Sequence, residues 1–473
     1  MAESTVDHSW DVIVIGAGPV GENAADRARK AGLTVAIVEK HLVGGECSFY
    51  ACSPSKALLR PVLVTHASQR VQGSEGARVD RDGVLARRDS WIDNLSDKGA
   101  VGWLDSAGID LVRGTARLAG ERRVEVEGRV YEARHAVIVA TGTAPLVPDL
   151  PGLRDANPWT NRDATTSPRV PERLVVLGGG PVACELAVVF AAIGSEVTIV
   201  EQEDRLLGRM ERFAAEAVAA GLREQGVRIR TGAAATKVTR PGQGGEVTVD
   251  LDNGESVVAD EILVAVGRVP NTADLGLDSV GVATDEKGYL PVTERMEVKG
   301  AVGDEPWLYA VGDVNGIALL THMGKYQGRA CGDLVGARAT GRPVDPASMT
   351  PWAEGLGTVQ VVWTDPEVAA TGLTEEQARE RGIRVRVVEV PMDSAAGSGL
   401  QAEGYQGRAR MVVDEDKGTM VGATLVGQDV AELVHPATVA IVGEVPLRTL
   451  WHAVPAFPSM SEIWLRLLEE YGI

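Results

Sequence analysis

The sequence predicts an α/β fold with two Rossmann-like domains, because one strand–turn–helix–strand pattern occurs twice. The first copy starts with the apolar run at 11–15, which is typical of a strand buried on both faces of a parallel sheet. A glycine-rich turn, a segment of helical character to Lys30 and a second apolar strand at 34–39 follow. The second copy begins 162 residues later, and ten of the 24 aligned positions are identical. The repeat therefore divides the chain into at least two α/β units.

Length and composition limit the class of protein. A chain of 473 residues is too long for one core, so two to four domains are expected. Its formal net charge of −19 disfavours binding to nucleic acid or to a membrane surface. No apolar run approaches a membrane span, and the start, MAESTVDHSW, does not resemble a secretory signal. We therefore expect a cytoplasmic protein with reduced cysteines.

The first glycine turn has the spacing of a dinucleotide fingerprint. Gly16 allows the tight turn, Gly18 lets a pyrophosphate approach the backbone, and Gly21 lets the helix pack closely on the strand. The phosphates would lie at the helix N-terminus, where free N–H groups favour anions. Glu39 lies 23 residues after Gly16, close to the position expected for an acid that accepts from a ribose hydroxyl.

The second copy repeats this fingerprint. It places Gly178, Gly180 and Ala183 in the glycine frame, and Glu201 again lies 23 residues after the first glycine. A duplicated sheet without a ligand does not explain why both second strands end in glutamate. Two dinucleotide sites imply electron transfer between two cofactors.

A pair of cysteines, Cys47 and Cys52, follows the first fingerprint. We predict no metal site, since zinc needs four ligands and the other cysteines, Cys184 and Cys331, are single and remote. A redox-active disulfide fits better. Five residues of regular helix rise ~7.5 Å, whereas bridged cysteines need Cα atoms closer than about 7 Å. The turn must therefore be distorted when the disulfide is closed, and strain would make the bond easier to reduce.

At this point the sequence resembles a known family. The run GGECSFYACSPSKALLR (44–60) resembles the cysteine motif of the flavoprotein disulfide reductases, and most of all that of the dihydrolipoamide dehydrogenases. Five further motifs resemble this family in chain order and extend the likeness over nearly the whole chain: VIVATGTAP (137–145), VAVGRVPNT (264–272), LYAVGDVNG (308–316), VVWTDPEVAATGLTEEQA (361–378) and FPSMSE (457–462).

The resemblance implies an architecture. An FAD-binding domain would cover 8–150 and be completed by 266–342, with an inserted NAD(P)-binding domain at 151–265. A C-terminal α+β interface domain at 343–473 would form a homodimer. Each active site would then use residues of both chains.

The resemblance also implies roles for individual residues. Cys52 would lie against the flavin ring, Cys47 would be the attacking thiol, and Lys56 and Glu185 would form a pair beside the flavin. Asp313 would accept from a ribityl or ribose hydroxyl. The remaining FAD-side positions lie where the chain leaves and re-enters the first domain: Thr141, Gly142 and Gly267.

The choice of nicotinamide cofactor depends on Glu201. A carboxylate at this position accepts from a 2′-hydroxyl and repels a 2′-phosphate, which favours NADH over NADPH. Arg205 and Arg209 follow closely and are candidates to hold a phosphate, so NADPH stays open.

One departure from the family affects the predicted chemistry. Where disulfide-exchanging members have HPTxSE, this chain has Phe457 at the histidine position and keeps Glu462. Phenylalanine cannot transfer a proton, and general acid–base help is worth roughly 10²–10⁴-fold. Thiol–disulfide exchange should therefore be impaired, unless His452 supplies the base.

Several functions remain open. The main prediction is an FAD-dependent, NAD(P)H-linked oxidoreductase acting on a small-molecule disulfide, quinone or related substrate. The 2-ketopropyl coenzyme M oxidoreductase/carboxylase also has phenylalanine at this position, but has histidine where this chain has Glu462. Quinone-reducing relatives need no base, although they often lack the cysteine pair. Mercuric reductase is disfavoured because no cysteine follows Cys331. The non-enzyme alternative is a dinucleotide-binding redox sensor.

Overall fold

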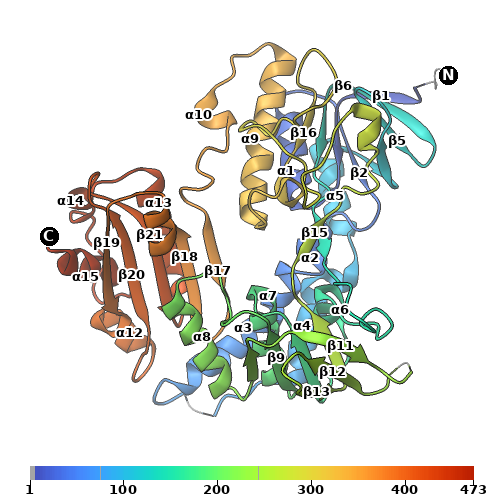
Figure 1. Cartoon of the computed structure of the whole chain (residues 1–473). Coiled ribbons are helices and arrows are strands. Elements are labelled where there is room, and N and C mark those ends of the chain that lie inside the picture. The colour runs from blue at the N-terminus through green and yellow to red at the C-terminus, as the bar shows by residue number, and fades with distance from the viewer. Residues whose placement is uncertain (1–5, 75, 243) are drawn as a thin grey trace. The chain divides into compact units, whose positions relative to one another are not determined.

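The computed structural model describes residues 6–74, 76–242 and 244–473 (Figure 1). It divides into two compact units, each of which contains one copy of the repeat. The first comprises residues up to 54, 89–145 and 268–354, and the second comprises 55–88, 146–267 and 355–473. The domain ranges implied by the resemblance remain a prediction.

The first unit is built on a mainly parallel sheet with the strand order β3-β2-β1-β6-β5-β4, in which β16 also pairs with β6. Val12 and Val14 of β1 belong to one hydrophobic cluster, whereas Ile13 and Ile15 belong to another. The predicted strand, buried on both faces, is thus confirmed. The strands are β1 (His8–Ile15), β2 (Val35–Glu39), β3 (Asp110–Arg113), β4 (Ala116–Leu118), β5 (Arg123–Val126), β6 (Arg129–Val139) and β16 (Leu308–Ala310). A separate two-stranded sheet pairs β7 (Thr143–Pro145) with β15 (Arg268–Pro270).

Helix α1 (Pro19–Lys30) packs closely against helix α9 (Thr321–Thr340), and Figure 1 shows the two side by side. The contact uses glycines four residues apart on α9. A Cβ on Gly328 would lie 2.6 Å from the Val20 carbonyl oxygen, and one on Gly332 would lie 2.6 Å from the Ala24 carbonyl oxygen. Real Cβ atoms do not come so close, so these positions need glycine. The other helices of this unit are α2 (Gly45–Phe49), α5 (Lys98–Ala107) and α10 (Pro346–Met349).

The second unit contains the second copy of the repeat in a parallel sheet with the order β10-β9-β8-β14. The predicted strand, helix and strand are confirmed as β8 (Arg173–Leu177), α7 (Pro181–Ala192) and β9 (Glu196–Glu201). The remaining strands here are β10 (Arg228–Thr231), β11 (Ala235–Thr239), β12 (Val247–Leu251), β13 (Ser256–Ala259) and β14 (Glu261–Val264). The helices are α3 (Cys52–Gln69) and α4 (Arg81–Trp91), which both cross a unit boundary, together with α6 (Asn161–Thr166) and α8 (Arg212–Glu224).

The C-terminal part of the second unit is an α+β domain, as the resemblance implied. Its five-stranded antiparallel sheet has the order β17-β18-β21-β20-β19, and buried residues of α13 and α15 share one hydrophobic cluster with it. The strands are β17 (Val359–Val362), β18 (Glu367–Gly372), β19 (Val385–Pro391), β20 (Arg408–Asp414) and β21 (Thr419–Gly427). The helices are α11 (Glu375–Glu380), α12 (Ala396–Gln401), α13 (Val434–Val442), α14 (Leu447–Leu450) and α15 (Glu462–Tyr471).

Within the described ranges, none of the helices combines the length and the apolar character that crossing a bilayer requires.

Candidate active site

The first glycine turn leads from β1 into α1. Gly16 has φ +103°, and a Cβ there would lie 2.5 Å from the Ala140 carbonyl oxygen. A Cβ on Gly21 would lie only 1.9 Å from the Gly16 oxygen, whereas one on Gly18 would meet nothing within 4 Å. The turn is therefore tightly packed at Gly16 and Gly21 and leaves open space at Gly18. This shape fits a pyrophosphate at the N-terminus of α1.

Glu39 ends β2 and holds this turn in place. One carboxylate oxygen accepts from the Ala17 N–H at 2.9 Å, and the other accepts from the His41 N–H at 2.8 Å. Each oxygen retains a lone pair, so the carboxylate is also able to accept from a ribose hydroxyl.

The second glycine turn has nearly the same geometry. Gly178 has φ +104°, and its Cβ would lie 2.6 Å from the Ala265 carbonyl oxygen, while a Cβ on Gly180 would meet nothing within 4 Å. Ala183, at the third position, is fully buried. Glu201 accepts from the Gly179 N–H and from the Glu203 N–H, the latter at 2.8 Å. Both turns therefore fit a dinucleotide.

The two arginines near Glu201 differ in their surroundings. Arg205 donates to the Gly208 carbonyl oxygen at 2.8 Å, and its Nε is buried with no hydrogen-bond partner in the described structure. Arg209 is exposed.

The cysteines lie on two helices that are interrupted between them. Cys47 belongs to α2, which ends at Phe49, and Cys52 begins α3, so the chain between the two free thiols is not a regular helix. The distortion expected for the closed disulfide remains a prediction. Thr321 Oγ1, at the start of α9, lies 3.2 Å from Cys47 Sγ and 3.5 Å from Cys52 Sγ. Contact with Cys52, together with burial, raises the pKa of the Cys47 thiol. The described residues contain no cluster of three or more metal-ligating side chains.

Asp313 is held by a short relay in the first unit. Thr143 Oγ1 donates to the Asp313 carboxylate at 2.8 Å, and Arg268 Nε donates to Thr143 Oγ1 at 2.6 Å. Burial raises the pKa of Asp313. The carboxylate retains lone pairs for a hydroxyl donor, in agreement with the role implied by the resemblance.

Two hydrogen bonds join Thr141 and Gly142 to Asn271, on the segment that re-enters the first unit. The Asn271 N–H donates to the Gly142 oxygen at 3.0 Å, and Thr141 Oγ1 donates to the Asn271 oxygen at 3.0 Å. Gly142 has φ +66° and Gly267 has φ +151°, both values that favour glycine.

Lys56 and Glu185 form an ion pair in the second unit. Lys56 Nζ lies 2.5 Å from Glu185 Oε2, and the Trp363 N–H donates to the other carboxylate oxygen at 3.1 Å. Glu185 is only 5% exposed, so it depends on both partners to offset the cost of burial.

The two predicted site residues of the C-terminal segment differ in exposure. Phe457 is 78% exposed, whereas Glu462 is 5% exposed. Glu462 accepts from the Ser459 N–H at 3.4 Å and lies 3.7 Å from Arg466. His452 is exposed, five residues before Phe457.

Three residues at these sites were not predicted from the sequence: Thr321, Thr143 and Arg268. Thr321 contacts cysteines 269 and 274 positions away, and no local pattern encodes such a contact. Thr143 and Arg268 lie inside motifs that were identified, next to residues that were singled out.

Comparison with known families gives two matches. Residues 10–328 match the family described as pyridine nucleotide-disulphide oxidoreductase. Residues 358–467 match the dimerisation domain of the same family.

Known proteins resemble the chain over nearly its whole length. It is 35% identical to dihydrolipoyl dehydrogenase from Thermus scotoductus, over 96% of this chain and 95% of that one. It is 30% identical to mercuric reductase from Staphylococcus aureus, over 96% and 81%. Among solved structures, RclA from Escherichia coli, described as an HOCl-induced flavoprotein disulfide reductase, has a TM-score of 0.83 at 26% identity, over 97% and 99%. LpdA from Mycobacterium tuberculosis has a TM-score of 0.84 at 25% identity, over 98% and 100%.

Proposed function

Because the chain belongs to the pyridine nucleotide-disulphide oxidoreductase family, we propose that it transfers two electrons from NAD(P)H to an acceptor through a redox-active Cys47–Cys52 pair. Members of this family are enzymes that bind FAD and use NAD(P)H. The single observation that carries the proposal is the contact of both sulfurs with one hydroxyl, that of Thr321. A shared partner supports two thiols that act together.

The two glycine turns would hold the cofactors. The turn at Gly16–Gly21 and Asp313 would bind FAD, and the turn at Gly178 with Glu201 would bind the nicotinamide nucleotide. FAD, when bound, supplies a carrier that accepts a hydride and passes on two electrons. The chain itself would place the pyrophosphates, accept from the ribose hydroxyls and present the cysteine pair.

The thiol step limits the choice of substrate. Cys47 must lose its proton to attack a disulfide, and its raised pKa leaves little thiolate at neutral pH without a base. Phe457 cannot accept the proton. We therefore propose that the acceptor needs less help from a base than lipoamide does. We also propose that the protein is a homodimer, because it carries the family's dimerisation domain.

A quinone is the second candidate acceptor. It takes electrons without thiol exchange and so needs no base, and the exposed phenyl ring of Phe457 at the base position favours it. Under this candidate the cysteine pair would not be required for turnover.

The experiment that separates the two candidates is Cys47→Ser, assayed with NADH against lipoamide, small disulfides and quinones. If the cysteine pair carries the electrons, the variant retains FAD and loses at least about 10²-fold of its activity with disulfides. Anaerobic reduction by NADH should also expose new titratable thiols in the native protein and not in the variant. Cys331→Ala, which removes a buried cysteine of α9, is the matched control.

Reduction that exposes no thiol in the native protein would rule out the redox-active disulfide. Undiminished quinone turnover in Cys47→Ser would instead favour the second candidate.

A further inference from the structure

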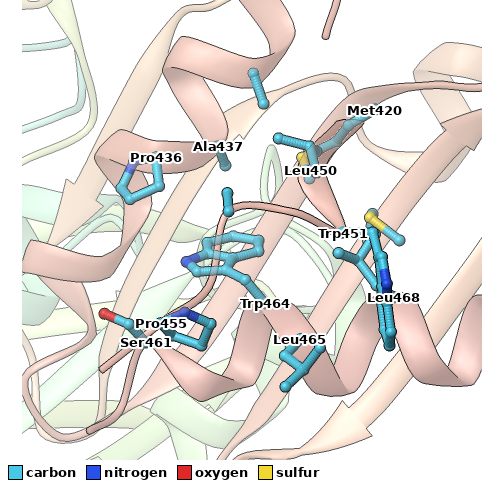
Figure 2. Close-up of a pocket in the computed structure, with 13 residues that line it drawn as sticks. Met420, Pro436, Ala437, Leu450, Trp451, Pro455, Ser461, Trp464, Leu465 and Leu468 are labelled. Atoms are coloured by element: carbon cyan, nitrogen blue, oxygen red, sulfur yellow. The ribbon is translucent and has the colours of Figure 1, made fainter. Parts of the chain in front are cut away.

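A cavity of about 180 Å³ lies in the C-terminal domain (Figure 2). It is bounded by β20 and β21 on the sheet side and by α13, α14 and α15 on the other. The space exists because α13 presents small side chains here, Ala437 and Ala440, where larger ones would fill it. Its rim includes Trp451, which is 38% exposed, so the cavity is accessible from solvent.

The walls favour an aromatic occupant. Figure 2 shows the indoles of Trp451 and Trp464 on opposite sides of the view, with Leu450 and Met420 above them and Leu465 below. Two thioethers, those of Met411 and Met420, also line the space. Indoles and thioethers both make favourable contacts with aromatic rings. An apolar cavity of about 150 Å³ in another protein binds benzene, so a single ring fits the volume.

One residue that lines the cavity has a hydrogen-bond donor without an acceptor in the described part of the chain. The indole Nε1 of Trp464 is buried and has no hydrogen-bond partner among the residues that the structure describes. An unmet buried donor is uncommon because it costs free energy. Apart from Trp451 and Ser461, the other side chains that line the cavity carry no polar N or O atom. An acceptor on the occupant would satisfy the Trp464 donor.

We propose that this cavity is a binding site for a small monocyclic aromatic molecule that carries one hydrogen-bond acceptor, such as an aryl ketone or aldehyde. The ring would lie among the indoles and thioethers, and the acceptor would take the Trp464 N–H. The inference does not depend on which electron acceptor the enzyme uses.

Binding would also act on the C-terminal segment. Trp451, Ala453, Pro455 and Ser461 line the cavity, and Phe457 lies between them in the sequence. An occupant would thus restrain the segment that carries Phe457 and leads into α15.

The test compares two probes of nearly equal size, acetophenone and ethylbenzene, which differ in the carbonyl acceptor. Titration calorimetry on the FAD-loaded protein should show one acetophenone site per chain. Ethylbenzene should bind the same site about two- to tenfold more weakly, the effect of one neutral hydrogen bond. Trp464→Phe keeps a ring and removes the donor, so the two probes should bind it equally. Trp103→Phe, at an exposed tryptophan of α5, should keep the native preference.

Ala440→Leu should fill the cavity and abolish binding of both probes, with an unchanged or higher melting temperature. If it fails to fold, Ala437→Val serves the same purpose. Three results would overturn the proposal: no binding of either probe to the native protein, equal binding of both, or binding that survives Ala440→Leu. In the first case, a changed oligomeric state in Ala440→Leu would assign the cavity to a side chain of a second copy.

Discussion

Two glutamates at the ends of β2 and β9 make the same hydrogen bonds to the two glycine turns. Glu39 and Glu201 each accept from the N–H two residues downstream and from the N–H that follows the first glycine of the turn. The carboxylate thus fixes the turn and keeps lone pairs with which to accept from a ribose hydroxyl. The agreement between the copies extends from sequence spacing to individual hydrogen bonds.

Replacing Glu201 by alanine should change the nucleotide preference. The native carboxylate repels a 2′-phosphate, so Glu201→Ala should raise the ratio of kcat/KM for NADPH to that for NADH by about tenfold or more. Steady-state rates with both nucleotides measure this ratio. Glu203→Ala, an exposed neighbour, should leave it unchanged. A native enzyme that already strongly prefers NADPH would contradict the argument and would indicate that Arg205 or Arg209 binds the 2′-phosphate.

Glu354 should make the stability of the first unit depend on pH. Gln327, which is fully buried, donates to Glu354 at 2.6 Å and accepts from the Gly312 N–H at 2.6 Å. Burial raises the pKa of Glu354 from 4.5 to about 7. Between about pH 4.5 and 7, Glu354 is therefore largely protonated in the folded state and largely ionised in the unfolded state. Stability contributed by this group is therefore lost as the pH rises through that window.

Glu354→Gln removes the charge and keeps an acceptor for Gln327. Relative to the native protein, the variant should gain about 1 kcal/mol between pH 5 and pH 8, a value reduced for partial solvent screening. Denaturant unfolding at both pH values measures the difference. Glu286→Gln, at an exposed position, should show no such gain. Parallel pH profiles for the native protein and Glu354→Gln would refute the assignment.

At the scale of elements, the glycines of α9 decide how closely it packs on α1. Alanine at Gly332 would gain up to about 1 kcal/mol of helix propensity, but its Cβ would lie 2.6 Å from the Ala24 carbonyl oxygen. Because that atom belongs to the backbone, the helices must separate. Gly332→Ala should therefore lower the melting temperature and speed the loss of FAD, since α1 begins at the phosphate turn.

Gly102→Ala provides the matched control for this prediction. Gly102 also lies inside a helix, α5, but a Cβ there would meet nothing within 4 Å. This variant should keep its FAD and melt at the native temperature or above. Equal behaviour of the two variants would show that the α1–α9 contact tolerates a methyl group.

The elements of the repeat could be predicted because their signals are local. An apolar run, a glycine spacing and a closing glutamate lie within 24 residues, and the structure places β1, α1 and β2 on them. The break between α2 and α3 is compatible with the distance limit on a disulfide, although both thiols are free here. The contacts of Thr321 with the cysteines and of Arg268 with Thr143 could not be predicted, because they join residues at least 125 positions apart. The exposure of Phe457 depends equally on packing that its motif does not encode.

At the scale of the whole molecule, the proposed homodimer gives the C-terminal segment a partner. Phe457 is 78% exposed and Val454 is 84% exposed, which is unusual for apolar side chains in one short segment. A second copy would cover these side chains. In the dimer implied by the resemblance, this segment completes the active site of the partner subunit.

Restoring the family pattern with Phe457→His should therefore raise turnover with NADH and lipoamide. This chain keeps Glu462, the residue that orients the histidine in the family pattern, so one substitution would restore the expected acid–base pair. The expected gain is roughly 10- to 1,000-fold. Turnover must be compared at equal flavin content and in the dimeric state, since a histidine on an isolated chain would have no cysteine pair to serve.

Val454→His is the control that tests whether the gain in turnover requires histidine at position 457 or only an imidazole anywhere in the segment. It adds histidine at another exposed apolar position, outside the motif frame, and should give no gain. A native enzyme that already turns over lipoamide rapidly would show that the base is supplied by His452 or is not needed. A dimeric, FAD-loaded Phe457→His enzyme that stays slow would mean that the pocket itself excludes lipoamide. Because the base would then be present and the cysteines unchanged, the quinone and reductase–carboxylase candidates would be favoured over lipoamide.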